Sequence, residues 1–336
     1  MLKKIIVSVF ALAIIAAAAA AYSVYAPNSF SEAAVIRIDE GMSAGMIGRA
    51  LKSRGLIRSS LAFKWYVAYS GSAQKLVSGT HEIKAGSSIS SIVAQLKSMD
   101  NSSRERTITA IEGWRLKELA AYLAKEGIAS EESFMAAAKI NDWSGKYPFL
   151  GDPKIRSLEG FLYPDTYNIF IDATPEDIIK KMLDEFDSKV TAQMRSDLRS
   201  RGRSLLEAVT LASIIEREIS NKPEYDSDRR IVSGIFWSRL EIGMGLQSDA
   251  TVNYATGKSM TRPTLKDLEI DSPYNTYKYR GLPPGPINSP SLASISAAIY
   301  PAETDYLYFL TDENGKAYFA ATYDGHLKNI RLYLDN

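Results

Sequence analysis

The stretch SLLEAVTLASIIEREIS, residues 204–220, predicts the most informative helix of the chain. Ser204 followed three residues later by Glu207 has the spacing of a capping box, which marks the start of a helix. At 100° per residue the apolar positions form one stripe that widens toward a second flank, so we expect the helix to be mostly buried. Even so, it carries Glu216 and Glu218.

These two glutamates are expected to point about 200° apart, because they are two positions apart on the helix. They therefore cannot act together on one bond as a close acid/base pair. Glu216 falls inside the apolar stripe, where a carboxylate needs a hydrogen bond or a cation. Glu218 falls at the flank, where a cleft wall would partly desolvate it and raise its pKa toward that of a general acid. A structural ion pair is the alternative interpretation for either residue.

The amino-acid composition limits the kinds of partner and of catalytic group that the chain can have. The 336 residues include 40 basic and 39 acidic side chains, a balance that argues against nucleic acid as a partner, and the length fits about two domains. There is no cysteine and there are only two histidines, so neither a thiolate nor a histidine-rich metal site is expected. The sequence predicts no metal and no cofactor, and a chemistry of carboxylates, hydroxyls, amides and aromatic rings.

The N-terminus predicts a membrane anchor. Residues 1–4 include Lys3 and Lys4 and should stay cytoplasmic, while residues 5–25 form an apolar run of 21 residues, against the ~20 that span a bilayer. Tyr22 and Tyr25 resemble interfacial anchors at its end. A cleaved signal peptide is the alternative, since the alanine run at 16–21 offers small residues, but its apolar core is usually only ~7 to 15 residues long.

Three segments in the next part of the chain share one sequence pattern. Residues 35–57, 81–98 and 107–128 each read as a short β-type run, a glycine and an apolar pattern with helical spacing, and a further helix is expected at 59–69. Residues 33–105 therefore predict a small α+β subdomain, with a linker at 100–103. It resembles a LysM-like module, which binds N-acetylglucosamine-containing glycans; a spacer without a ligand is the alternative.

Residues 106–336 predict a mixed α/β domain, so the fold class of the whole chain is α+β. Helical patterns cover 178–190 and 204–219, and a helix at 327–334 is expected to close the chain. Two alternating runs, 305–310 and 317–322, flank an Asn-Gly pair and predict a hairpin.

Five ordered blocks carry a resemblance to a known family. They are LEGFLYPDTY (158–167), LASIIEREIS (211–220), RLEIGMGLQSDATVNYATG (239–257), SPYNTYKYRGLPPGPINSPS (272–291) and YPAETDYLYFL (300–310). Along nearly its whole length the chain resembles the YceG-like endolytic murein transglycosylases, known as the MltG family. The resemblance implies an inner-membrane anchor, a LysM-like subdomain and an extracytoplasmic catalytic domain, a lyase that cuts peptidoglycan glycan strands internally.

The resemblance also implies roles for individual residues. The catalytic glutamate of the family falls on Glu218, with Glu216 as the alternative, and Ile219 stands where the family often has Thr or Ser. Ordinary glycosidases use two carboxyl groups, whereas a lytic transglycosylase needs one, which first protonates the glycosidic oxygen and then accepts a proton from the 6-hydroxyl of N-acetylmuramic acid.

Sugar-binding candidates lie in the other blocks. Polar and aromatic side chains that can contact sugar hydroxyls, acetamido groups or ring faces are Gln247, Ser248, Asp249, Thr251, Tyr254, Tyr274, Asn275, Tyr277, Tyr163 and Asp165. For each of them a turn-stabilising or packing role is the alternative.

Partners follow from the same resemblance. It implies peptidoglycan glycan strands as substrate, peptidoglycan synthases as neighbours and a role in ending nascent strands. The rival functions are a membrane-anchored glycan-binding scaffold without catalysis and a muramidase that hydrolyses the same bond with water.

Overall fold

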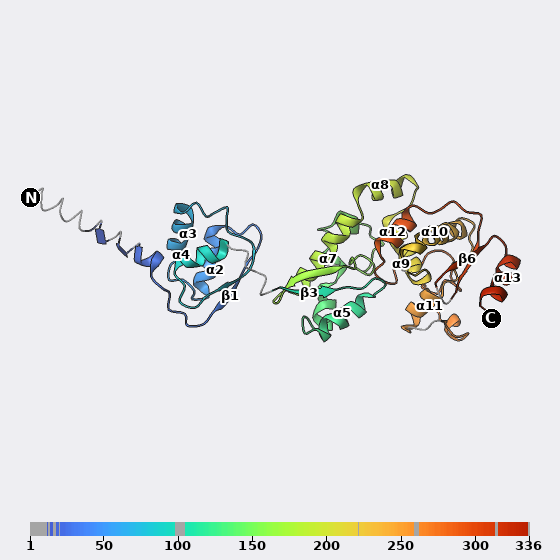
Figure 1. The fold of residues 1–336 in the computed structure, drawn as a ribbon, viewed down its shortest axis with the longest axis horizontal. Helices are drawn as coiled ribbons and strands as arrows, with labels where there is room; N and C mark the ends of the chain where they lie inside the picture. The colour runs from blue at the N-terminus through green and yellow to red at the C-terminus, as the bar shows by residue number, and fades with distance from the viewer. Residues whose placement is uncertain are drawn as a thin grey trace, which may run out of the picture. The chain divides into compact units, whose positions relative to one another are not determined.

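The computed structural model describes residues 12, 14–15, 18–19, 21–97, 105–220, 222–258, 262–312 and 315–334. The chain divides into two compact units, Met1–Glu105 and Arg106–Asn336, each with its own hydrophobic core (Figure 1). Most of the anchor expected at residues 5–25 lies outside the described residues. Within the described part of the chain, no helix combines the length and the apolar character needed to cross a membrane.

The first unit follows a strand-helix-helix-strand order that ends in a further helix. Its elements are β1 (Ala34–Ile38), α2 (Ala44–Ser53), α3 (Ser60–Tyr69), β2 (Gly79–Ile83) and α4 (Ile89–Lys97). β1 and β2 pair antiparallel, with Ile36 opposite His81. Serines at the N-cap positions start both α2 and α3, which confirms the helix expected at 59–69. The core is built from these five elements, and the residues packed on it begin at Phe30.

The second unit is mostly helical, with short two-stranded sheets. Its elements are β3 (Glu105–Thr109), α5 (Leu116–Lys125), α6 (Glu131–Ala137), η1 (Ile140–Asp142), η2 (Pro148–Leu150), β4 (Thr166–Phe170), α7 (Pro175–Lys189), α8 (Ala192–Ser200), α9 (Leu205–Glu218), η3 (Pro223–Tyr225), α10 (Asp226–Glu241), α11 (Asp249–Thr256), η4 (Asp267–Glu269), α12 (Leu292–Ile299), β5 (Tyr308–Thr311), β6 (Ala317–Ala320) and α13 (Tyr323–Tyr333). β3 pairs with β4, and β5 pairs antiparallel with β6.

Helix α9 is the buried helix expected from the sequence. The Ser204 and Glu207 side chains bond reciprocally to each other's backbone N–H, at 3.2 Å and 2.7 Å, so the capping box is confirmed. The helix packs against α8, α10, α11 and α12, and Figure 1 shows it at the centre of the second unit. A side chain on its last turn is therefore held by a rigid support.

The backbone of residues 286–291 is bonded along α9. The Ser213 hydroxyl accepts a hydrogen bond from the Ile287 N–H at 3.0 Å, and the Asn288 amide donates to the Ser213 carbonyl at 2.8 Å. Gly160 lies against the same seam with a φ of +81°, and a Cβ at this position would sit 2.4 Å from Pro286. This close packing accounts for Gly160 in the block at 158–167 and for Asn288 in the block at 272–291.

The C-terminal hairpin differs in its boundaries from the sequence-based expectation. The predicted run at 317–322 is a strand only to Ala320, and the predicted helix at 327–334 already begins at Tyr323. The reason is local, because the Thr322 hydroxyl accepts a hydrogen bond from the Gly325 N–H at 3.2 Å and so acts as an N-cap. The expected Asn-Gly turn falls on Asn314, outside the described residues.

Candidate active site

Glu218 is the last residue of α9 and opens into a cleft of about 980 Å³. The cleft is lined by α9, α10, the segment at 246–249, strand β5 and helix α13. Its wall combines charged, aromatic and aliphatic side chains, including Arg217, Arg239, Tyr277 and Tyr308. The site therefore joins elements from the C-terminal half of the second unit, between Arg217 and Leu334.

The Ser248 hydroxyl holds the Glu218 carboxyl group. Ser248 occupies the N-cap position of α11, but its side chain makes no capping bond. Instead its Oγ donates to Glu218 Oε1 at 2.5 Å. A side chain that ordinarily stabilises its own helix start is here directed at the carboxylate of another helix.

Burial raises the pKa of Glu218 to about 7. The hydrogen bond from Ser248 opposes that rise, whereas the negative charge of Asp249 adds to it. The carboxyl group also lies at the negative end of the α9 dipole, which disfavours its ionised form. Because a carboxyl group with a pKa near 7 is divided between its two forms at neutral pH, Glu218 can both donate and accept a proton.

A strained turn positions Ser248. Gln247 has a φ of +52°, and among the described residues it is the one non-glycine residue with a positive φ. The turn is fixed from one side by Thr276, whose carbonyl accepts from the Gln247 N–H at 3.2 Å and whose hydroxyl accepts from the Ser248 N–H at 3.0 Å. Thr251 completes the support, with its hydroxyl 2.7 Å from the Ser248 carbonyl. Strain of this kind persists where the surroundings overdetermine a functional geometry.

Arg239 links two segments next to the cleft through hydrogen bonds to their backbone. Its guanidinium donates to the Leu246 and Leu307 carbonyls, both at 2.7 Å, and lies 5.6 Å from the centre of the Tyr308 ring. Burial lowers the pKa of Arg239 and, together with the charge of Arg239, that of His326 across the cleft. The His326 ring stacks on Tyr308 with centres 5.6 Å apart.

Sequence reasoning missed this part of the wall. Tyr308, Tyr323 and His326 follow Glu218 by about a hundred residues. Tyr308 lies in the matched block at 300–310, whereas nothing in the local pattern of Tyr323 and His326 distinguishes them from core aromatic residues. Arg239 stands at the start of a matched block, RLEIGMG, and could have been singled out as a cation close to the expected carboxylates.

Glu216 points away from the cleft, as the helical spacing predicts. It is buried, and its Oε2 accepts hydrogen bonds from the Ser291 N–H at 3.0 Å and the Ser291 hydroxyl at 2.7 Å. Ser291 is the N-cap of α12, so Glu216 fastens the start of that helix to α9. The geometry gives Glu216 a structural role and Glu218 the position in the cleft.

The other predicted residues divide into two groups. Gln247, Ser248, Asp249 and Tyr277 line the cleft with Glu218, and the Tyr277 hydroxyl donates to Asp249 Oδ1 at 2.7 Å. The structure does not bring the remaining six to the lining of this cleft, and these are Thr251, Asn275, Tyr254, Tyr274, Tyr163 and Asp165.

Structural contacts account for most of that second group. Asn275 is fully buried and donates to the Leu268 and Ile270 carbonyls at 2.8 Å and 3.0 Å. Tyr254 and Tyr274 pack on each other, with ring centres 4.7 Å apart. Tyr163 is buried in the core, and exposed Asp165 accepts a hydrogen bond from the backbone of the next residue. In the described structure the polar groups of Asn275 and Asp165 therefore bond to the loop backbone, and the three tyrosines pack.

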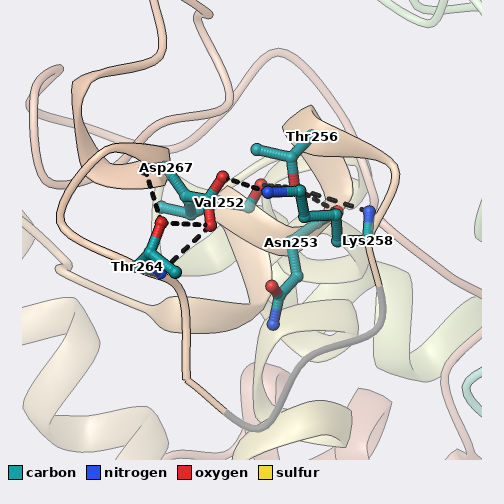
Figure 2. A network of polar contacts seen from close by, with 6 residues as sticks. All are labelled: Val252, Asn253, Thr256, Lys258, Thr264 and Asp267. Atoms are coloured by element: carbon teal, nitrogen blue, oxygen red, sulfur yellow. Dashed lines mark hydrogen bonds and ion pairs between the residues drawn. The ribbon is translucent and has the colours of Figure 1, made fainter.

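A polar network closes the segment that follows α11. Figure 2 shows Thr264 and Lys258 converging on the Asp267 carboxylate, with the Thr264 N–H and hydroxyl at 3.0 Å and 2.7 Å and the Lys258 ammonium at 2.6 Å. The hydrogen bonds from Lys258 and Thr264 hold the pKa of Asp267 at about 2. On the helix side, the Thr256 hydroxyl donates to the Val252 carbonyl at 3.1 Å and accepts from the Lys258 N–H at 3.4 Å, so Lys258 joins the end of α11 to η4.

Glu159 is a second carboxyl group whose pKa burial raises to about 7. Its Oε1 accepts a hydrogen bond from the Leu116 N–H at 2.8 Å, at the first turn of α5. It does not line the cleft of Glu218. A raised pKa alone therefore does not identify the acid, and it is the position in the cleft that distinguishes Glu218.

A carboxyl group with a raised pKa in a cleft with polar and aromatic walls is typical of an enzyme that uses general acid/base catalysis. Comparison with known families makes the assignment specific. The model of the YceG-like family matches residues 36–332, and the chain belongs to that family. The resemblance noted in the sequence is thereby confirmed.

Two relatives of this chain are both named endolytic murein transglycosylase. The chain is 36% identical over 312 residues to the endolytic murein transglycosylase of Bacillus subtilis, a match that covers 90% of this chain and 85% of that protein. It is 32% identical over 328 residues to the endolytic murein transglycosylase of Streptococcus pneumoniae, covering 90% of this chain but 58% of that longer protein.

A solved structure shares the fold. The crystal structure of a putative YceG-like protein from Listeria monocytogenes superimposes with a TM-score of 0.61 at 32% sequence identity, covering 89% of this chain and 99% of that one.

Proposed function

We propose that this protein is an endolytic murein transglycosylase, a lyase that cleaves peptidoglycan glycan strands internally. The observation that carries the proposal is the Glu218 carboxyl group, which lies in the cleft, is held at 2.5 Å by Ser248 and has its pKa raised to about 7. Family membership and the names of the relatives from B. subtilis and S. pneumoniae support the reaction and the substrate class.

The reaction needs only one group that exchanges a proton. Protonated Glu218 donates to the oxygen that links N-acetylmuramic acid to the next sugar, and the bond from that oxygen to the anomeric carbon breaks. The 6-hydroxyl of the same N-acetylmuramic acid then bonds to the anomeric carbon and gives its proton to the Glu218 carboxylate. The enzyme returns to its starting form, a 1,6-anhydro end is left, and no water is consumed. The opposed directions of Glu216 and Glu218 fit this single-carboxyl chemistry.

The wall of the cleft supplies binding groups for the sugars. Gln247 and Asp249 are polar neighbours of Ser248, and Tyr277 and Tyr308 offer aromatic faces. Aromatic faces beside hydrogen-bonding groups suit amphipathic ligands such as pyranose rings. Arg239 acts on the substrate indirectly, because it holds the backbone of Leu246 and Leu307 on either side of the cleft.

The proposal extends to location. The apolar run at residues 5–25 anchors the chain in the inner membrane, with residues 1–4 in the cytoplasm and both units outside. In that setting the first unit, with the LysM-like order of strands and helices, stands next to the bilayer, and the enzyme ends nascent strands close to the synthases that make them.

The product decides the reaction. Full-length protein in detergent is incubated with nascent glycan strands, and the products are weighed by mass spectrometry. We expect 1,6-anhydro-N-acetylmuramic ends that disappear with Glu218→Gln and persist with Glu216→Gln, the matched control on the same helix. Reducing ends, each heavier by one water, would identify a hydrolase instead. Strands that are bound but uncut by the wild type would identify a scaffold.

A further inference from the structure

The first unit carries a strongly basic segment. Between residues 41 and 81 the sequence holds no aspartate or glutamate, while the chain as a whole is nearly neutral. The basic side chains of this segment are all exposed, and they are Arg49, Lys52, Arg54, Arg58, Lys64 and Lys75. Clusters of four to eight such side chains next to a membrane segment are typical of contact with anionic lipid headgroups.

Helix α3 lies within this segment and is apolar on two sides. Its inner side buries Phe63 and Val67 in the core. Its outer side presents Leu61, Trp65 and Tyr69, which are 62%, 68% and 88% exposed. These three residues follow one another at intervals of four, so they form one stripe on the helix. Lys64 lies beside the stripe, as in helices that rest in a membrane interface.

The end of the N-terminal apolar run reaches the same helix. Tyr25 contacts Tyr66 of α3 edge to face, with ring centres 6.0 Å apart. Arg58, just before α3, donates to the Pro27 carbonyl at 2.8 Å and lies 5.6 Å from the centre of the Tyr22 ring. The segment that leaves the apolar run is therefore fastened to α3 and to the residue just before it, and its Tyr22 and Tyr25 are themselves exposed.

We propose that α3 and the basic segment around it form a docking surface for an anionic phospholipid bilayer. Leu61, Trp65 and Tyr69 enter the interfacial region, where amphipathic aromatic rings are favoured. The surrounding lysines and arginines pair with phosphate headgroups. This membrane contact is separate from the cleavage reaction. It depends on the proposed anchor in one respect only, which is the membrane that the surface meets. Its consequence is that the first unit lies on the bilayer and does not extend from it on a free tether.

The first test separates this surface from the anchor. A chain that begins at residue 21 keeps both cores, because the residues packed on the core of the first unit begin at Phe30. We expect it to sediment with vesicles that contain phosphatidylglycerol, to bind phosphatidylcholine vesicles weakly, and to be released by salt. Replacing Lys52 and Lys64 with Gln should weaken the binding roughly tenfold or more at low salt.

The aromatic stripe is tested with a matched control. Leu61→Ser, Trp65→Ser and Tyr69→Ser together should remove the part of the binding that persists in salt. Ile171→Ser with Leu265→Ser, two exposed apolar residues of the second unit, should leave the vesicle binding unchanged. Equal binding by the stripe variant and the wild type would overturn the proposal. So would a stripe variant that keeps vesicle binding but loses binding to purified peptidoglycan, since the stripe would then be a glycan site.

The absence of cysteine permits a test in the full chain. An environment-sensitive fluorophore on Ala68→Cys, beside the stripe, should shift to the blue when the protein is placed in nanodiscs that contain phosphatidylglycerol. The same label on Ala85→Cys, in the exposed turn after β2, should keep its emission in water. Similar spectra at the two positions would contradict the docking. Cleavage of soluble strands by the stripe variant should equal that of the wild type, and a loss of cleavage in the variant would contradict a stripe that contacts only the bilayer. A wild type that docks on vesicles but cuts no strands would count against the proposed function alone.

Discussion

Replacing Ser248 with alanine should raise the pKa of Glu218. The Ser248 hydroxyl donates to Glu218 Oε1 at 2.5 Å and stabilises the carboxylate form. This hydrogen bond lowers the pKa of Glu218, whereas burial raises it, and the result is a pKa of about 7. A hydrogen bond to a charged group is worth about 1.5–3 kcal/mol, and one pKa unit corresponds to about 1.4 kcal/mol. Because Glu218 is partly exposed and water can replace the hydroxyl, we expect the lower part of that range, a rise of about one unit.

The assay is the pH dependence of kcat/KM for the release of anhydro ends. Since Glu218 must be protonated to begin the reaction, activity falls as pH rises through its pKa. In Ser248→Ala this fall should move up by about one pH unit. Ser291→Ala, which removes the hydroxyl bonded to Glu216 at 2.7 Å, is the matched control and should leave the profile in place. A fall that stays where it is in Ser248→Ala, or moves to lower pH, would refute the assignment of Glu218 as the acid.

Three further predictions concern the support of the site. Gly160→Ala should lower the free energy of unfolding by about 2 kcal/mol or more, measured by denaturant titration, because its Cβ would sit 2.4 Å from Pro286 at a φ of +81°; an unchanged midpoint would show that the seam can yield. Glu216→Gln should cost about 1–3 kcal/mol in the same experiment, because both Ser291 donors bond to Glu216 Oε2 and lose their charged acceptor. Asp267→Asn should lower the melting temperature most above about pH 4. The pKa of Asp267 is held at about 2 in the folded chain, so its stabilisation is complete above the unfolded pKa and disappears as the pH falls through 2; a difference that grows toward low pH would contradict this.

The sequence predicted helix α9 well because the signals that define it are local. The capping box at Ser204, the burial of the helix and the opposed directions of Glu216 and Glu218 all follow from helix geometry, and each is present in the structure. The recognition of the family is also confirmed. The membrane anchor and the LysM-like assignment stay predictions.

The walls of the site could not be predicted in the same way. Thr251 and Asn275 were predicted to bind sugar, yet both side chains are buried and bonded to nearby backbone or hydroxyl groups. A polar residue in a loop that ends buried must satisfy its neighbours, and neither composition nor spacing tells that role from ligand binding. Tyr308 and His326 line the cleft because α13 packs on the β5–β6 hairpin, and the Thr311 hydroxyl of β5 bonds to the Glu218 carbonyl at the end of α9.

The two glutamates of α9 explain why one short motif carries both stability and chemistry. Glu216 and Ser213 bond the backbone of residues 286–291 to the buried face of the helix, and this fixes the helix in the core. On the other face, Glu218 meets a hydroxyl whose own position is fixed by the turn at Gln247 and by Thr276. The neighbours of Glu218 and of Ser248 thus fix both partners of the 2.5 Å contact, so little reorganisation is needed when the proton moves. The strain at Gln247 is offset by this network, and its result is a carboxyl group held in place for the proton transfer that we propose.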